Sequence, residues 1–143
     1  EIARFIKRFS FFPLLGSAKG LRMPVHAEDV ASACISASNN SNATNHTYNI
    51  SGAETLTYRN MVERIFIALG KRPNFIRIPL NIFKLAVFCL RVFPRYRHWS
   101  FAMAERMNKN LVFEHTDAAQ SFEYNPRSFS LSQKDISIDI FPK

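Results

Sequence analysis

The beginning of the chain alternates between helical and extended patterns of apolar residues. Over Glu1–Phe9 the apolar side chains fall on one helical face and the basic side chains on the other. We therefore expect a helix there, whose apolar face comprises Ile2, Phe5, Ile6 and Phe9. Phe11–Leu15 then predicts an extended segment at the edge of a sheet, because Pro13 has no N–H to donate to a central ladder.

The next stretch, Leu21–Ala37, predicts a short strand that turns at once into a helix. Its small apolar face repeats at helical spacing, at Val30, Ala33, Cys34 and Ala37. We expect Asp29 in the first turn, where unpaired N–H groups and the helix dipole favour a carboxylate. Arg22 lies on the incoming strand, after a turn that contains Gly16 and Gly20. This combination suggests a phosphate site, and the alternative is a surface arginine beside a capped helix.

The middle of the chain reads as strand, helix and strand. Thr47–Ile50 and Asn74–Ile78 are the predicted strands. Between them we expect Thr57 to cap a helix and Gly70 to end it in the left-handed conformation. The buried face of that helix is expected to comprise Met61, Val62, Ile65, Phe66 and Leu69, with Leu56 and Met61 forming a hydrophobic staple across the cap. This βαβ-like pattern indicates an α/β fold, with a small mixed sheet and packed helices.

A long apolar helix is predicted over Leu80–Phe93, with Pro79 suited to its first position. Because this helix is apolar nearly all round, it is either buried against another domain or lies on a membrane surface, and we favour burial. Beyond it we expect a helix from a Ser100 cap to Met107 and a strand at Leu111–Phe113. A further helix, capped by Thr116, is predicted over Asp117–Phe122. The end of the chain is expected to form a last strand or an extended tail that contains Ile136, Ile138 and Ile140.

Length and composition indicate one globular domain over residues 1–143. The chain is 47% apolar and 21% charged, as globular proteins are. No apolar run reaches the ~20 residues that span a bilayer. Cys34 and Cys89 lie among apolar residues, so we expect buried thiols of a reducing compartment rather than a disulfide. The first residue is Glu, no signal peptide follows, and we interpret the chain as a piece of a longer cytoplasmic protein.

The chain is strongly basic, with a net charge of +8 and a pI near 9.9. Such a charge is typical of nucleic-acid binders, but the sequence contains neither zinc-finger spacing nor an RNA-recognition signature. A surface that receives an anionic small molecule or lipid headgroups explains the charge as well. We therefore do not expect nucleic acid as a partner.

The sequence contains no complete catalytic or metal-binding pattern. With four glycines it has no Gly-rich cofactor loop, and none of its tyrosines is followed by Lys at the fourth position. Its histidines show no metal-ligand spacing. His26 near Asp29 allows an acid/base pair, although a structural histidine is the more common case. We expect no catalytic, cofactor-binding or metal-binding residue in this piece alone.

Three segments resemble the carboxyl half of the extended short-chain dehydrogenases/reductases, the NAD-dependent epimerase/dehydratase family. Arg22 followed by Val25-His26-x-x-Asp29-Val30-Ala31 resembles the Arg-x-x-(Val/Ile)-His-x-x-Asp-(Val/Leu)-Ala signature. Tyr48-Asn-Ile-Ser-Gly52 and Asp117-x-x-x-Ser121-Phe122-Glu-Tyr124-x-Pro126 resemble two later motifs, in the same order. The resemblance covers most of the chain, and together with the segment Phe12–Gly16 these motifs make it fairly specific.

The resemblance implies the substrate-binding C-terminal part of an NAD(P)-dependent nucleotide-sugar epimerase, dehydratase or reductase. Its Rossmann half, which supplies NAD(P) and the catalytic tyrosine and lysine, would lie outside this chain. Arg22 would then contact the substrate diphosphate or another anionic group. His26 and Asp29 would form the structural junction of the signature. The expected lining of the substrate pocket is Phe12, Pro13, Leu14, Leu15 and Gly16.

Departures from the family pattern favour an atypical branch, which includes the accessory subunit of respiratory complex I. The segment after Ile78 lacks the second phosphate contact of nucleotide-sugar epimerases, and Met23-Pro24 removes a stacking contact. Glu123 replaces a usual Gly, so we expect that turn to be built differently. The alternative function is therefore a non-catalytic accessory or membrane-surface protein. Apolar faces around Ile2–Phe12 and Leu80–Phe93 would lack partners, so we expect self-association in isolation.

Overall fold

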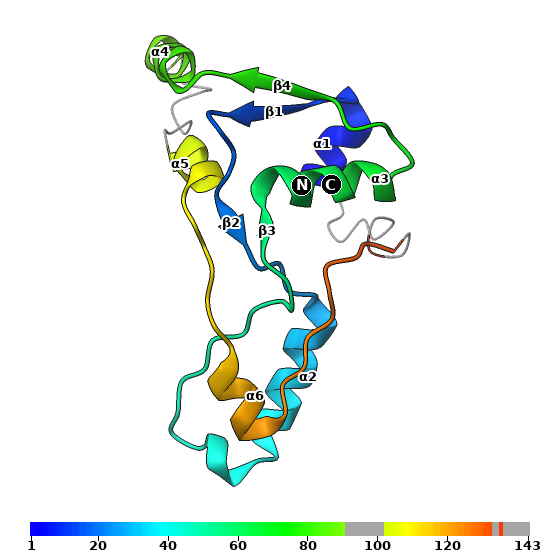
Figure 1. Ribbon diagram of the computed structural model, residues 1–143, viewed down its shortest axis with the longest axis vertical. Coiled ribbons are helices and arrows are strands. Elements are labelled where there is room, and N and C mark those ends of the chain that lie inside the picture. The colour runs from blue at the N-terminus through cyan, green and yellow to red at the C-terminus, as the bar shows by residue number, and fades with distance from the viewer. Residues whose placement is uncertain (91–101, 133–134, 136–143) are drawn as a thin grey trace. The chain divides into compact units, whose positions relative to one another are not determined.

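The computed structural model describes residues 1–90, 102–132 and 135, and they separate into two compact units (Figure 1). The first unit comprises the described residues of Glu1–Leu21, Thr57–Asn110 and Leu131–Lys143, and the second comprises Arg22–Leu56 and Leu111–Ser130. The single domain expected over residues 1–143 stays a prediction.

The first unit is built on a parallel pair of strands, β1 (Phe12–Leu15) and β4 (Phe75–Ile78). Helices α1 (Ile2–Phe9) and α3 (Tyr58–Ala68) pack against each other beside this pair (Figure 1). The side chains buried most completely come from α1, β1 and α3, and they are Ile6, Leu14, Val62 and Phe66.

Two further helices complete the first unit, α4 (Leu80–Leu90) directly after β4 and α5 (Ala102–Asn108) against β1. At the end of α5, Asn108 donates from Nδ2 to the carbonyl of Leu15 over 2.8 Å and accepts at Oδ1 from the N–H of Ala18 over 3.1 Å. One amide therefore holds the turn that follows β1. Among the described residues, none of the helices has both the length and the apolarity to cross a membrane.

The second unit is mostly helical. Helices α2 (Ala27–Ser38) and α6 (Thr116–Phe122) lie side by side, and a 3-10 turn, η1 (Ser41–Ala43), contacts both (Figure 1). Its core contains Ala33, Ala118, Phe122 and Tyr124, with Ala37, Ala43, Tyr48 and Ile50 packed against it. The short strands β2 (Leu21–Arg22) and β3 (Leu56–Thr57) form a second pair, and each of them contributes one residue to each unit.

The α/β fold class is confirmed, and so are several local predictions. Thr57 accepts the N–H of Asn60 at its Oγ1 over 3.1 Å, as a helix N-cap does. Gly70 follows α3 with φ +66°, in the left-handed region that glycine enters without steric cost. Asp29 lies in the first turn of α2.

Other local predictions are wrong. Thr47–Ile50 is not a strand, because Tyr48 and Ile50 pack their side chains on the core of the second unit and the backbone joins no described ladder. The parallel partner of β4 is therefore β1 and not the segment before α3. Leu111–Phe113 contributes a single bridge, from Leu111 to Arg22.

Two side-chain predictions are also corrected. Cys34 and Cys89 are free thiols, but both are exposed, because α2 and α4 turn other residues toward their cores. Thr116 is the first residue of α6 and not its cap, a position taken by His115. The predicted cap at Ser100 and the residues Val92, Phe93, Ile136, Ile138 and Ile140 lie outside the described residues.

Candidate functional site

The start of α2 carries a charged cluster within the second unit. His26 precedes the helix in an extended conformation and accepts the N–H of Glu28 at Nδ1 over 3.2 Å, which makes it the N-cap. Glu28 and Asp29 occupy the first turn, where the positive end of the helix dipole favours carboxylates. His26 therefore caps α2 through its side chain, and its place in the structural junction of the signature stays a prediction.

Asp29 is buried and paired with Arg127, which follows α6 in the chain. Arg127 donates from Nε to Oδ1 over 2.7 Å and from its backbone N–H to Oδ2 over 3.0 Å, so both carboxylate oxygens are used. Its Nη1 also donates to Glu28 over 3.0 Å. The hydrogen bond to Asp29 raises the pKa of Arg127 above its ordinary value. The guanidinium therefore stays charged at every working pH, as this pairing requires.

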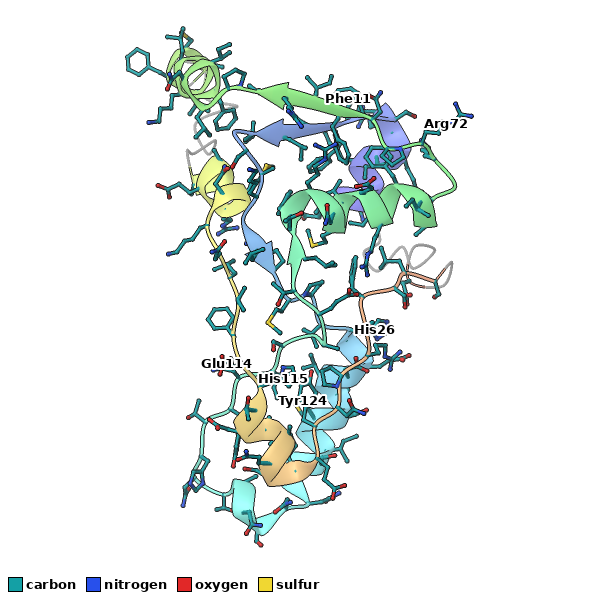
Figure 2. All side chains as sticks on the ribbon, viewed as in Figure 1. Phe11, His26, Arg72, Glu114, His115 and Tyr124 are labelled. Atoms are coloured by element: carbon teal, nitrogen blue, oxygen red, sulfur yellow. The ribbon has the colours of Figure 1, made fainter. Side chains whose placement is uncertain are left out.

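A second polar cluster joins Ser51, His115 and Tyr124. The hydroxyl of Ser51, which is 3% exposed, lies 2.7 Å from both the carbonyl of Phe113 and Nδ1 of His115. Tyr124 donates its hydroxyl to the carbonyl of Ser51 over 2.9 Å. The rings of His115 and Tyr124 meet edge to face with centroids 5.5 Å apart (Figure 2).

The chemistry of this cluster depends on which partner receives the single hydroxyl proton of Ser51. A hydroxyl has one proton, and here it is donated to the carbonyl of Phe113, which cannot donate in return. His115 must then donate from Nδ1 to the Ser51 oxygen, so Nδ1 carries a hydrogen. A serine nucleophile needs a base that accepts its proton. In this arrangement Ser51 and His115 hold chain segments together, because the hydroxyl proton is directed to Phe113 and not to the imidazole.

Tyr124 is held in its neutral form by the same surroundings. Burial, with a smaller contribution from the negative charge of Asp29, raises the pKa of the phenol above its ordinary value near 10. The hydroxyl therefore remains a donor to Ser51 at neutral pH, which suits a structural role.

The residues that the sequence predicts for substrate binding fall in both units. Phe12, Leu14 and Leu15 are buried in the first unit, whereas Pro13 and Gly16 are half-buried there. Arg22 is half-buried in the second unit and forms a parallel bridge with Leu111. The pocket-lining and anion-binding roles of these residues stay predictions.

The sequence offered little signal for Arg127, Ser51 and the hydroxyl of Tyr124. Arg127 is a lone basic residue after Pro126, in a segment that otherwise carries acidic side chains, and only that contrast could have suggested an ion pair. Glu123 also differs from expectation. It ends α6 with φ +58° and ψ +35°, so the turn keeps the left-handed conformation that a glycine would adopt easily.

None of the groups of His, Cys, Asp and Glu in the described part of the chain could hold a metal ion. No protein-family model matches the chain. Over 81 residues, which make up 56% of the chain, it is 27% identical to the Arabidopsis thaliana protein "NADH dehydrogenase [ubiquinone] 1 alpha subcomplex subunit 9, mitochondrial". That match spans only 20% of the relative's own length. The similarity is distant and consistent with the broad superfamily of the short-chain dehydrogenases/reductases that the motifs resemble.

Proposed function

We propose that this chain is the C-terminal, substrate-side part of an extended protein of the short-chain dehydrogenase/reductase type. In this proposal NAD(P) and the catalytic residues belong to another part of the same protein. The observation that carries the proposal is that the three segments resembling family motifs meet in the second unit. Asp29 of the first segment pairs with Arg127, directly after the third, and Tyr124 of the third donates to Ser51 of the second.

Gly52 adds a further link between these segments. Its N–H donates to the carbonyl of Met23 over 3.3 Å, and a Cβ at this position would lie 2.0 Å from the carbonyl oxygen of Pro24. Only glycine allows the two backbones to approach so closely. The glycine of the second motif thus contacts the backbone segment that leads into the helix of the first motif. This contact supports a common origin of the motifs rather than chance matches.

The proposed ligand is a nucleotide sugar or another anionic small molecule, acted on by an isomerase or oxidoreductase of the cytoplasm. Arg22 would hold its anionic group, because a guanidinium offers planar paired donors to phosphate oxygens. The segment Phe12–Gly16 would border the ligand.

The test begins with the full-length gene product, which should purify with bound NAD(P) detectable by absorbance and by release on denaturation. Arg22→Ala should weaken binding of a nucleoside diphosphate sugar at least about tenfold while NAD(P) binding is unchanged, since the loss of one charge-assisted contact has that size. Arg106→Ala, at an exposed position of α5, is the matched control. A full-length protein without NAD(P), or one whose Arg22→Ala variant binds the sugar nucleotide normally, contradicts the proposal.

A second candidate function is that of an accessory subunit of an NADH dehydrogenase, which the name of the plant relative favours. It predicts that the tagged full-length protein migrates with NADH dehydrogenase subunits at high mass on a native gel. Migration at low mass alone, together with cytoplasmic fractionation, would exclude this candidate.

A further inference from the structure

Helix α4 has an apolar face on each side. Phe83 and Val87 turn toward the first unit and are 8% and 6% exposed. On the opposite side Ile82, Leu85 and Phe88 are 60%, 65% and 76% exposed. A surface helix normally has a polar outer face, so this second apolar face requires another explanation.

The charge of the chain is concentrated around this helix in the sequence. Between Glu63 and Glu105 the sequence contains no acidic residue. The same interval contains eight basic residues, which are Arg64, Lys71, Arg72, Arg77, Lys84, Arg91, Arg95 and Arg97. The other 11 basic residues balance the 11 acidic residues, so the whole net charge of +8 arises from this interval. An uncovered apolar helix face thus lies within the most cationic part of the sequence.

We infer that α4 docks on an anionic lipid surface, with its outer face buried at the boundary between headgroups and acyl chains. A helix of 11 residues is about 16 Å long, which suits a position parallel to the membrane. Apolar side chains supply the burial, and the exposed Lys84 on the helix and Arg77 on the preceding strand add attraction to anionic headgroups. The interval between Glu63 and Glu105 carries positive charge alone. This favours an anionic lipid surface over a protein groove, where positive and negative side chains normally occur together. The inference holds for either proposed function.

The test is sedimentation of the full 143-residue chain with vesicles. We expect binding to vesicles of phosphatidylcholine and phosphatidylglycerol at three to one, weakened by salt, and little binding to phosphatidylcholine alone. The double variant Leu85→Gln, Phe88→Gln should lower the partition coefficient at least about tenfold, a ratio equivalent to about 1.4 kcal/mol. Ile35→Gln, Ile67→Gln is the matched control, since these residues are 63% and 64% exposed on other helices.

A probe on the unaltered helix face makes the test independent of the double variant. Cys89 is exposed on α4 and Cys34 on α2. An environment-sensitive fluorophore on Cys89, in a Cys34→Ser chain, should shift its emission to shorter wavelength when anionic vesicles are added. The same fluorophore on Cys34, in a Cys89→Ser chain, should show no such shift.

Three kinds of result would overturn the inference. One is failure of the sedimentation test itself, either as absence of binding to the anionic vesicles or as an equal loss of binding in both double variants. Another is an oligomer that the α4 variant converts to a monomer without any change in vesicle binding, which would assign the face to a second copy of the chain. The third is loss of vesicle binding in a longer protein with the upstream region attached, which would assign the face to that region.

Discussion

Replacing Gly52 by alanine should cost more stability than any other small substitution in the second unit. The added Cβ would lie 2.0 Å from the carbonyl oxygen of Pro24 and 2.8 Å from its carbonyl carbon. The two backbones would have to separate by about 1 Å or more, because heavy atoms repel well inside ~3.5 Å. Separation would break the hydrogen bond from Gly52 to Met23 and displace Ser51, the acceptor for Tyr124. Overpacking of about 1–3 kcal/mol and two hydrogen bonds of ~1 kcal/mol each give about 3–5 kcal/mol.

Gly70→Ala is the matched control for this prediction. Gly70 has φ +66° and no neighbouring atom within 4 Å of the point that an alanine methyl would occupy, so alanine there meets strain in the backbone alone, about 1 kcal/mol. Urea unfolding followed by circular dichroism gives both free energies, and hydrogen exchange shows whether the loss with Gly52→Ala is confined to residues 22–56 and 111–130. A loss for Gly52→Ala no larger than for Gly70→Ala would refute the steric argument.

Three further substitutions test the cluster around α2 and α6. Asp29→Asn should lower the urea midpoint more than Glu28→Gln, because Asp29 is buried and Glu28 is exposed; equal midpoints would contradict the pairing scheme. Tyr124→Phe should cost about 1 kcal/mol at neutral pH. The raised pKa of Tyr124 means that the folded state holds the phenol proton more tightly than the unfolded state does. The stabilisation from this tyrosine is therefore complete below about pH 10 and declines above it. Urea unfolding at about pH 8 and 10.5 should accordingly show a smaller loss of stability in Tyr124→Phe than in the unchanged chain. Glu123→Gly should raise stability by about 0.5–1 kcal/mol by relieving the positive φ, and a thermal melt without any increase would contradict that strain.

Features of the fold that depend on neighbours in sequence could be predicted. The cap at Thr57, the left-handed Gly70 and the first-turn position of Asp29 follow from local hydrogen bonding and backbone sterics, which four or five residues decide. Pro13 likewise marks a strand at the side of a sheet.

Features that depend on distant partners could not be predicted. The carboxylate of Asp29 pairs with an arginine 98 residues away, and no pattern near Asp29 indicates which cation it meets. The wrong strand prediction at Thr47–Ile50 has the same cause. The segment has a β-like sequence, but Tyr48 packs its ring on Phe122 and the backbone joins no described ladder. Glu123 shows a further limit, because the fold imposes a conformation that its residue type disfavours.

The way α5 covers β1 determines where the small parallel sheet can be extended. On the side of β1 away from β4, Pro13 has no N–H, the N–H of Leu15 meets the sulfur of Met107, and the carbonyl of Leu15 accepts from Asn108. That side therefore offers no N–H donor to a further strand. Within the described residues, no strand pairs with the far side of β4, where alternate backbone groups point outward. The free side of β4 is accordingly the side of the described sheet that offers both N–H and carbonyl groups to an additional strand.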